Sequence, residues 1–346
     1  MSKGSKVIVV AAILVASATS LACGAVKRTT AARRVSADGG DARTDFRPTA
    51  WEAFSPAVEA PRPRVVQSLL CAATKPEACE GSCMSLAPHD AAHCALDLAY
   101  ADDPDARVLA RDLLALTGAV PGLEQGQRID AGYLGLVPIE PTLPIGPYRQ
   151  HLVWLRDGIL AIERVFAAAA QAAPKPVLFR TRPYGFRFFK TEERTYPSAY
   201  AIEGIVGYNL EGPLHDSQDN VTATLFHELF HLNDEARGQW SQSALGGLLE
   251  QVVATCEDDH ACLGRFAPTD DRVPDGTYYP FDARTRDVRE YGAEIALRWF
   301  REQRALLEGA ALAAPPFKCG ADENAQAWQA IVEEFFGGLD LTGECA

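Results

Sequence analysis

The sequence has few basic side chains relative to its acidic ones, and this deficit argues against a nucleic-acid-binding protein. It contains 33 Lys and Arg against 46 Asp and Glu, for a formal net charge of -13. The imbalance is concentrated in residues 66 to 346, which hold 23 basic and 41 acidic side chains. Charge of that sign repels phosphate backbones. We therefore expect no nucleic-acid partner.

A hydrophobic run long enough for a typical membrane span is also missing. The stretch VIVVAAILVASATSLA follows Lys3 and Lys6 and is short for that purpose. A basic start before a short apolar segment is typical of a signal peptide, so we expect residues 1–22 to be removed on export. The next letters, SLACG, resemble the processing box of bacterial lipoproteins, which implies acylation of Cys23. We expect a lipoprotein of the bacterial cell envelope that contacts the membrane only through this lipid, or otherwise a secreted protein.

Cysteine, in contrast, is well represented, and its number fits an oxidising compartment. Nine cysteines are present, and lipidation of Cys23 would leave an even set of eight. Four of them crowd within 71–94, two flank a short acidic loop, and two lie close to the C-terminal end. This spacing favours local disulfides, although eight cysteines allow many pairings. The disulfide candidates are Cys71, Cys79, Cys83, Cys94, Cys256, Cys262, Cys319 and Cys345.

No internal repeat is evident, and composition divides the chain into four parts. After the signal peptide, residues 23–65 are rich in Ala, Arg, Asp, Gly and Pro without periodicity, which predicts a flexible tether. Residues 66–117 show helical spacing around four cysteines and predict a small disulfide-bearing helical region. Residues 118–346 form the main domain.

Within the main domain, hydrophobic spacing predicts strands first and helices afterwards. Proline and glycine in 118–145 favour irregular extended chain, and apolar spacings of three and four predict a long helix over 148–173. Short β-branched and aromatic runs predict strands at 176–182, 185–190, 198–204 and 205–210. Helices are expected over 219–236, 242–255, 285–307 and 322–336. This order favours a helix-rich α+β fold with a small twisted sheet.

The stretch LFHELFHLND, residues 225–234, places two histidines four positions apart with a glutamate directly after the first. On a helix, positions i and i+4 project from one face, so His227 and His231 can reach a single ion. Glu228 then points beside the ion, within reach of a water at an open coordination position. The pattern predicts a catalytic divalent metal. The alternative is an ordinary buried helix.

Two histidines do not complete a catalytic zinc site, which normally has three protein ligands and a water. Glu235 lies one turn after His231, but a straight helix cannot direct three successive turns at one ion. The later stretch RDVREYGAEIALRWF places Glu290 and Glu294 one turn apart among apolar residues. Buried carboxylates need a charged partner, so one could bind the ion and the other a histidine N–H. Alternatively, an exposed acidic pair is neutralised by Arg289 or Arg298, the basic residues of the same stretch.

The ordered pair HELFH and EYGAE resembles the zincin metallopeptidases over roughly residues 175 to 305. Within them the chain is similar to the gluzincins, and specifically to anthrax lethal factor-type catalytic domains. The resemblance implies a zincin-like domain with one Zn²⁺ per chain, bound by His227, His231 and Glu290, with Glu294 supporting a ligand. The long separation of the two motifs leaves Glu290 and Glu294 both open as the third ligand.

If these ligands are right, Glu228 acts as the general base on an acidified water. Related peptidases place a tyrosine or histidine close to the third ligand to stabilise the oxyanion. Tyr278 and Tyr279 in DGTYYPFD are the local candidates, and packing is the alternative role for loop tyrosines.

We therefore expect zinc-dependent hydrolysis of a peptide or protein substrate by an exported endopeptidase. The substrate backbone would pair in extended form with an edge strand near AIEGIVGYNL. The alternative is a non-catalytic zincin-like lipoprotein that acts as a binding or adaptor module. The presence of Glu228 favours the enzyme, because a purely structural metal site has no use for a general base.

Overall fold

The computed structural model describes residues 54–345, except 73–75, 131–134, 193–195, 258, 274–275 and 283–285. The predicted signal peptide and Cys23 lie outside the described residues. Among the helices of the described chain, none combines the length and the apolar composition that crossing a membrane requires.

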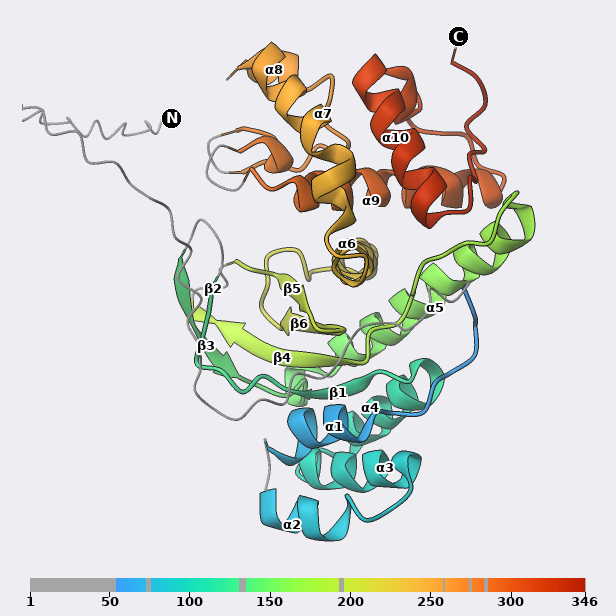
Figure 1. Ribbon diagram of the computed structural model, residues 1–346. Helices are drawn as coiled ribbons and strands as arrows, with labels where there is room; N and C mark the ends of the chain where they lie inside the picture. Colours follow the sequence, from blue (N-terminus) through green and yellow to red (C-terminus); the bar gives the residue numbers. More distant parts are fainter. Residues whose placement is uncertain are drawn as a thin grey trace, which may run out of the picture. The chain divides into compact units, whose positions relative to one another are not determined.

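A small sheet of short strands lies between two groups of helices (Figure 1). Its strand order is β2-β3-β4-β6-β5, and β1 pairs with β4 on the same side as β3. The neighbours β1 and β6 run parallel to β4, whereas the other pairs are antiparallel. The strands are β1 Val120–Leu123, β2 Arg128–Asp130, β3 Leu136–Pro141, β4 Gly185–Thr191, β5 Ala199–Ile202 and β6 Ile205–Asn209.

The sheet differs from the sequence prediction at two places. The proline-rich range 118–145, expected to be irregular, supplies the short strands β1, β2 and β3. The apolar run 176–182, expected to be a strand, has no strand partner. Its backbone groups instead bond to other partners: Leu178 N–H donates to Phe335 O at 3.0 Å, and Arg180 N–H donates to Asn233 Oδ1 at 2.8 Å. Helix ends and side chains therefore replace a ladder there.

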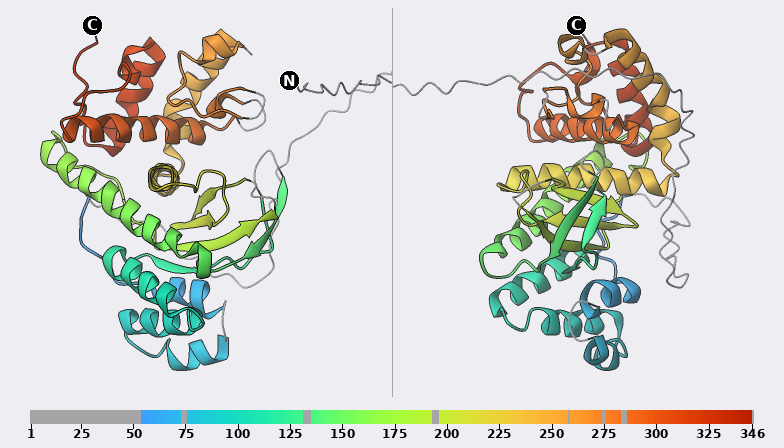
Figure 2. Two further views of the ribbon diagram at one scale, coloured as in Figure 1. Left: turned by 180° about the vertical axis from the view of Figure 1, so that it is seen from behind. Right: turned by 90° about the vertical axis from the view of Figure 1, so that its left-hand side faces the viewer.

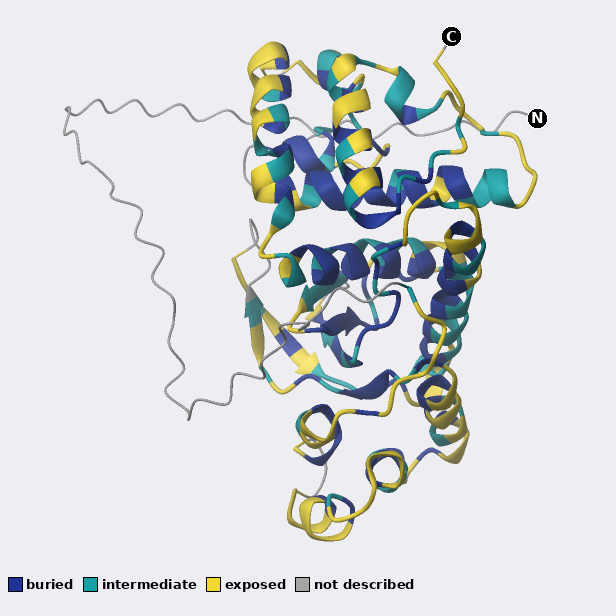
Figure 3. Ribbon diagram, turned by 45° about the vertical axis from the view of Figure 1, so that its right-hand side comes forward, coloured by how far each residue is buried: buried dark blue, intermediate teal, exposed yellow. Residues whose placement is uncertain are grey.

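The helices surround this sheet in layers. Helix α6 lies between the sheet and α9, and α7 and α10 lie beyond α9 in both the front and the turned views (Figures 1 and 2). Their outward faces are exposed, whereas α9 is largely buried (Figure 3). The α-helices are α1 Pro63–Val66, α2 Pro76–Ser82, α3 Pro88–Ala99, α4 Pro104–Thr117, α5 Gln150–Ala172, α6 Gln218–Ala236, α7 Trp240–Cys256, α8 His260–Leu263, α9 Val288–Leu307 and α10 Asp322–Phe335. Single turns of other helix types are η1 Gln67–Cys71, η3 Gly146–Tyr148, η5 Tyr279–Phe281 and η6 Phe317–Cys319.

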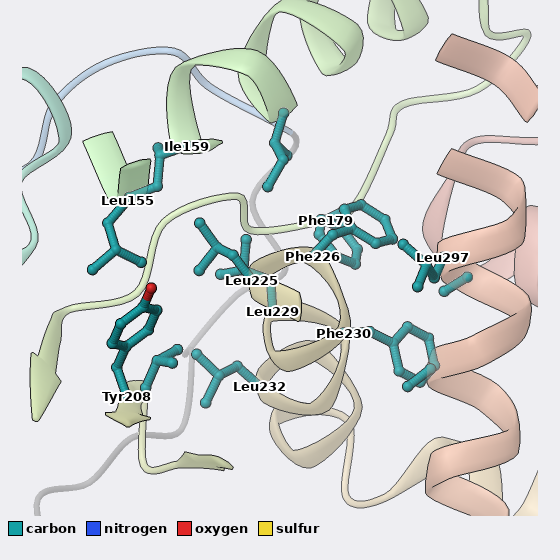
Figure 4. Close-up of a cluster of buried hydrophobic side chains, with 14 of the residues drawn as sticks. Leu155, Ile159, Phe179, Tyr208, Leu225, Phe226, Leu229, Phe230, Leu232 and Leu297 are labelled. Carbon is teal, nitrogen blue, oxygen red and sulfur yellow. The ribbon is translucent and has the colours of Figure 1, made fainter. Parts of the chain in front are cut away.

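Helix α6 is held by apolar contacts on two of its faces (Figure 4). Leu225, Leu229 and Leu232 point toward α5 and the sheet, where Tyr208 lies. Phe226 and Phe230 point the other way, toward α9. All of these side chains are 3% exposed or less, so the helix cannot rotate without opening the core.

The N-terminal helices α1 to α4 pack on the side of the sheet opposite to α6 (Figures 1 and 2). One continuous cluster of buried side chains includes both these helices and the main domain, so they share a core. The part of the predicted tether that is described, residues 54–65, also contacts this body. Phe54 N–H donates to Val177 O at 2.8 Å, and Glu59 forms a two-pronged ion pair with Arg180. The predicted boundary at residue 65 is therefore too late.

Four local disulfides connect the eight predicted cysteines. The pairs are Cys71–Cys79, Cys83–Cys94, Cys256–Cys262 and Cys319–Cys345. The first two cross-link the turns around α2 and α3, the third closes the α7–α8 connection, and the fourth ties η6 to the C-terminal end. With helices predominating and one small sheet, the α+β class predicted from the sequence is confirmed.

Candidate metal centre

The two histidines project from the middle of α6. The helix begins at Gln218 and is capped by Ser217, whose hydroxyl accepts a hydrogen bond from Asn220 N at 3.3 Å. Leucines and phenylalanines fill the buried faces of α6. The histidines project from a different face, next to the first turn of α9, where Glu290 lies. The imidazoles of His227 and His231 lie edge to face with centroids 4.7 Å apart. They share one face, as the spacing of four predicts.

Helix α9 supplies two carboxylates to the same place. It is capped by Asp287, whose side chain accepts from Arg289 N at 2.9 Å, so Glu290 lies in its first turn. Gly292 allows the close approach to α6, since a Cβ there would lie 3.0 Å from the Phe230 ring. A larger residue would force the Phe230 ring to give way at the contact between α6 and α9, which carry the histidines and the two glutamates.

Three donor atoms converge at this junction. His227 Nε2 lies 3.0 Å from His231 Nε2 and 3.0 Å from Glu290 Oε2, and the third distance, from His231 Nε2 to Glu290 Oε2, is 3.4 Å. The three side chains are 13%, 14% and 19% exposed, so the cluster is open to solvent on one side. The sequence-predicted ligands His227, His231 and Glu290 therefore meet at one point.

Glu294 occupies a different place, on the far side of the His227 ring. Its Oε1 lies 3.0 Å from His227 Nδ1, and its other oxygen accepts a hydrogen bond from Thr269 Oγ1.

The sequence left open that Arg289 or Arg298 neutralises the two glutamates. In the structure these arginines bind other carboxylates: Arg289 pairs with Asp287 at 2.6 Å, and Arg298 with Glu302 at 2.5 Å. The two glutamates therefore hold histidines rather than arginines.

The donor set fits a divalent ion such as zinc. Because Nδ1 of His227 faces a carboxylate, a neutral ring carries its proton there and directs the Nε2 lone pair at Glu290 and His231. Lone pairs and a carboxylate that point at one another repel unless a cation lies between them. Ligands bound at about 2.1 Å in a tetrahedron are about 3.4 Å apart, close to the separations found here. Two imidazoles and one carboxylate are also ligands that zinc accepts.

The pKa shifts of His227 and Glu290 also indicate that the cluster favours a positive charge. Burial lowers the pKa of His227, but hydrogen bonds to Glu290 and Glu294 outweigh this and hold the pKa well above its ordinary value. Burial raises the pKa of Glu290, but the charge of His231 and the hydrogen bond with His227 outweigh it and hold the pKa well below its ordinary range. The Glu290 carboxylate is thus kept ionised, and His227 attracts a proton on the side where a metal ion would bind.

Glu228 lies next to the cluster and is not one of its converging ligands. Its side chain is 6% exposed, and burial raises its pKa above the ordinary glutamate value. The charges of His231 and His227 act on it in the opposite direction, which places the carboxylate close to both rings. Glu228 is therefore a buried carboxyl group with a raised pKa beside the three converging ligand atoms.

The two candidate tyrosines are in different surroundings. Tyr279 begins η5, and its hydroxyl donates a hydrogen bond to Glu290; burial, then the charges of Glu290 and Glu228, raise its pKa well above the ordinary value. Tyr278 points away, where its ring lies 3.9 Å under the Arg272 guanidinium and its hydroxyl accepts from the same arginine. Tyr279 is thus at the cluster and Tyr278 is a packing residue.

Sequence reasoning missed two residues that complete the site, Thr269 and Asp271. Both lie in the connection between α8 and η5, in the letters APTDD, which contain no recognisable motif. Thr269 Oγ1 contacts Glu294 and lies 3.2 Å from Asp271 Oδ2. Only the fold brings this loop to Glu294, so no local signal in the sequence could have identified it.

Other polar residues near the motif have structural roles. Asp234 accepts hydrogen bonds from Ser241 N and Oγ at the start of α7, and Glu235 is exposed and accepts from Glu203 N at 3.1 Å. His151 is buried with its Nδ1 2.9 Å from the Tyr208 hydroxyl. These groups lie outside the set of converging ligands.

Comparison with known proteins adds no relative to this picture. No family model, no curated protein and no solved structure matches the chain.

Proposed function

We propose that this protein is a zinc-dependent endopeptidase with a zincin-like catalytic domain. The observation that carries the proposal is the convergence of His227, His231 and Glu290 from two helices, with Glu228 buried beside them. A structural metal site closes all four positions with protein ligands, whereas a catalytic site leaves one open. The three converging ligands and their partial exposure support the catalytic type.

A zinc ion held by these residues would act as a Lewis acid and lower the pKa of water at the open position. Glu228 would take the proton from that water and deliver it to the leaving nitrogen of the peptide bond. Tyr279, whose hydroxyl is already at Glu290, would donate a hydrogen bond to the developing oxyanion. Glu294 would hold the His227 ring in the orientation and tautomer that binding requires.

An edge strand beside the site supports a peptide as the substrate. Strand β5 is the last strand of the sheet, pairs only with β6 among the described strands, and packs next to α6. Its outer edge offers backbone groups to an extended chain, which can then lie along the sheet and cross the cluster on α6. This agrees with the strand predicted near AIEGIVGYNL.

Export and lipid anchoring at Cys23 are part of the same proposal. They are supported by the sequence signals in the first 23 residues and by four disulfides, which persist in oxidising compartments. In this view the catalytic body works at the bacterial cell envelope, with the membrane contacted through the lipid alone.

The test is a single carboxylate-to-amide substitution. Purified protein should contain about one zinc ion per chain and cleave members of a broad peptide library in a chelator-sensitive way. Glu228→Gln should retain the zinc and lose cleavage, because an amide cannot accept the proton. Glu235→Gln, on the exposed side of the same helix, is the matched control and should cleave at the wild-type rate.

Two outcomes would decide against an enzyme. Cleavage that survives Glu228→Gln would remove the proposed base from the mechanism. A wild-type protein that binds zinc and hydrolyses nothing in the library would favour the alternative, a zincin-like binding or adaptor module.

A further inference from the structure

Thr269 is a buried residue that is linked to the candidate metal ligand His227 through Glu294. It lies in the connection between α8 and η5, is 7% exposed, and donates its hydroxyl proton to Glu294 Oε2. Glu294 is 3% exposed, and its other oxygen lies 3.0 Å from His227 Nδ1. Three separate elements are thus joined in a line that ends at the His227 ring: the loop, α9 and α6.

The hydroxyl of Thr269 can serve only one carboxylate. It lies 3.2 Å from Asp271 Oδ2 and closer to Glu294 Oε2, and it has a single proton to give. Asp271 is exposed and can be solvated by water, whereas Glu294 is buried. The proton therefore belongs to Glu294, where an unpaired oxygen would cost the most. Asp271 N–H, 3.4 Å from Thr269 Oγ1, helps to orient the hydroxyl as its donor.

Both oxygens of Glu294 are in this way tied to different elements, and the plane of the carboxylate is fixed. A carboxylate held at one oxygen only can rotate about its last side-chain torsion and move its second oxygen off the ring nitrogen. The His227 ring would then lose the partner that sets its orientation and places its proton on Nδ1. The connection extends to Tyr279, whose N–H donates to Asp271 O at 2.9 Å.

We propose that Thr269 is a positioning residue: its hydroxyl fixes Glu294, and through Glu294 it holds His227 ready to bind the metal. This inference rests on the proposed function, in that it requires the cluster to bind a metal ion. It predicts an effect on metal affinity from a residue that does not contact the metal.

The experiment compares metal affinity in the full-length protein and three variants. Metal is removed by chelation, and Zn²⁺ and Co²⁺ are titrated back, with the visible absorption of Co²⁺ reporting ligand geometry. Thr269→Val, which keeps the shape and removes the hydroxyl, should weaken binding about tenfold, the lower end of the range for partners of metal ligands. Thr269→Ser keeps the hydroxyl and should bind like the wild type. The control is Thr117→Val: Thr117 is also buried and donates to Leu113 O at 2.6 Å, on the opposite side of the sheet.

The outcomes separate the two proposals. Wild-type affinity and an unchanged Co²⁺ spectrum in Thr269→Val would overturn the role of Thr269 and leave the metal site intact. An equal loss in Thr269→Ser would also overturn it, because the hydroxyl would then not be the active feature; this comparison remains decisive if the valine variant does not fold. A wild-type protein that binds no metal would overturn both.

Discussion

Glu294 Oε1 lies 3.0 Å from His227 Nδ1, on the opposite ring nitrogen from the one that faces Glu290 and His231. This single contact separates the roles of two glutamates that are one turn apart on the same helix. Glu290 Oε2 lies beside the Nε2 atoms of both histidines, whereas Glu294 contacts Nδ1, on the other side of the His227 ring. Their substitution should therefore have different consequences.

We expect Glu290→Ala to abolish stoichiometric zinc binding, because it removes one of three ligands. Glu294→Ala should keep the site but weaken zinc affinity by about 10- to 100-fold, because it removes only the partner of a ligand. The measurement is zinc content by elemental analysis, followed by competition with a chelator. Zinc lost from Glu294→Ala and retained by Glu290→Ala would reverse the assignment.

We expect the two neighbouring tyrosines to differ in catalysis. Tyr279→Phe should lower kcat by about 10²-fold with zinc content unchanged, as for loss of one donor to an oxyanion. Tyr278→Phe should leave kcat at the wild-type level, because its hydroxyl is engaged with Arg272. Steady-state kinetics of both variants on one peptide decide the question. Equal kcat values for Tyr279→Phe and the wild type would show that the oxyanion is stabilised by another group.

We expect the stability of the fold to fall in mild acid because of a buried cluster away from the metal. Burial lowers the pKa of His151 to about 4 and that of His215, stacked on the Tyr208 ring, to about 3. The unfolded chain, with ordinary histidine pKa values of about 6.5, binds these protons first. Stability is therefore fully present above about pH 6.5 and is lost as pH falls toward the folded-state values.

The size of this effect can be measured with one substitution. Near pH 5 each of the two histidines contributes about 1.4 kcal/mol per pH unit to the slope of the unfolding free energy. His215→Gln should reduce the slope by about that amount, as measured by urea unfolding between pH 7 and 4.5. His89→Gln, at an exposed position of α3, is the control. An unchanged slope in His215→Gln would mean that His215 is not the group that takes up the proton.

Several features of this fold were predictable because they depend on residues that are close in sequence. Apolar spacing located α5, α6, α7, α9 and α10, and the short distances between cysteines indicated the four disulfides. The prediction of a strand over 176–182 was wrong for a physical reason. Its composition suits a strand, but a strand needs a neighbouring ladder, and α10 and Asn233 bind its backbone instead.

The sequence by itself determined that His227, Glu228 and His231 occupy adjacent positions on one helix, since the spacing of a helix places i and i+4 on the same face. Only the tertiary structure decided which glutamate, 59 or more residues further along, meets the lone pairs of both histidines and which one contacts the other side of the His227 ring. That choice depends on the approach of α9 to α6 at Gly292 and on the loop that carries Thr269 and Tyr279. Such contacts come from the packing of distant segments, and no local pattern of residues encodes them.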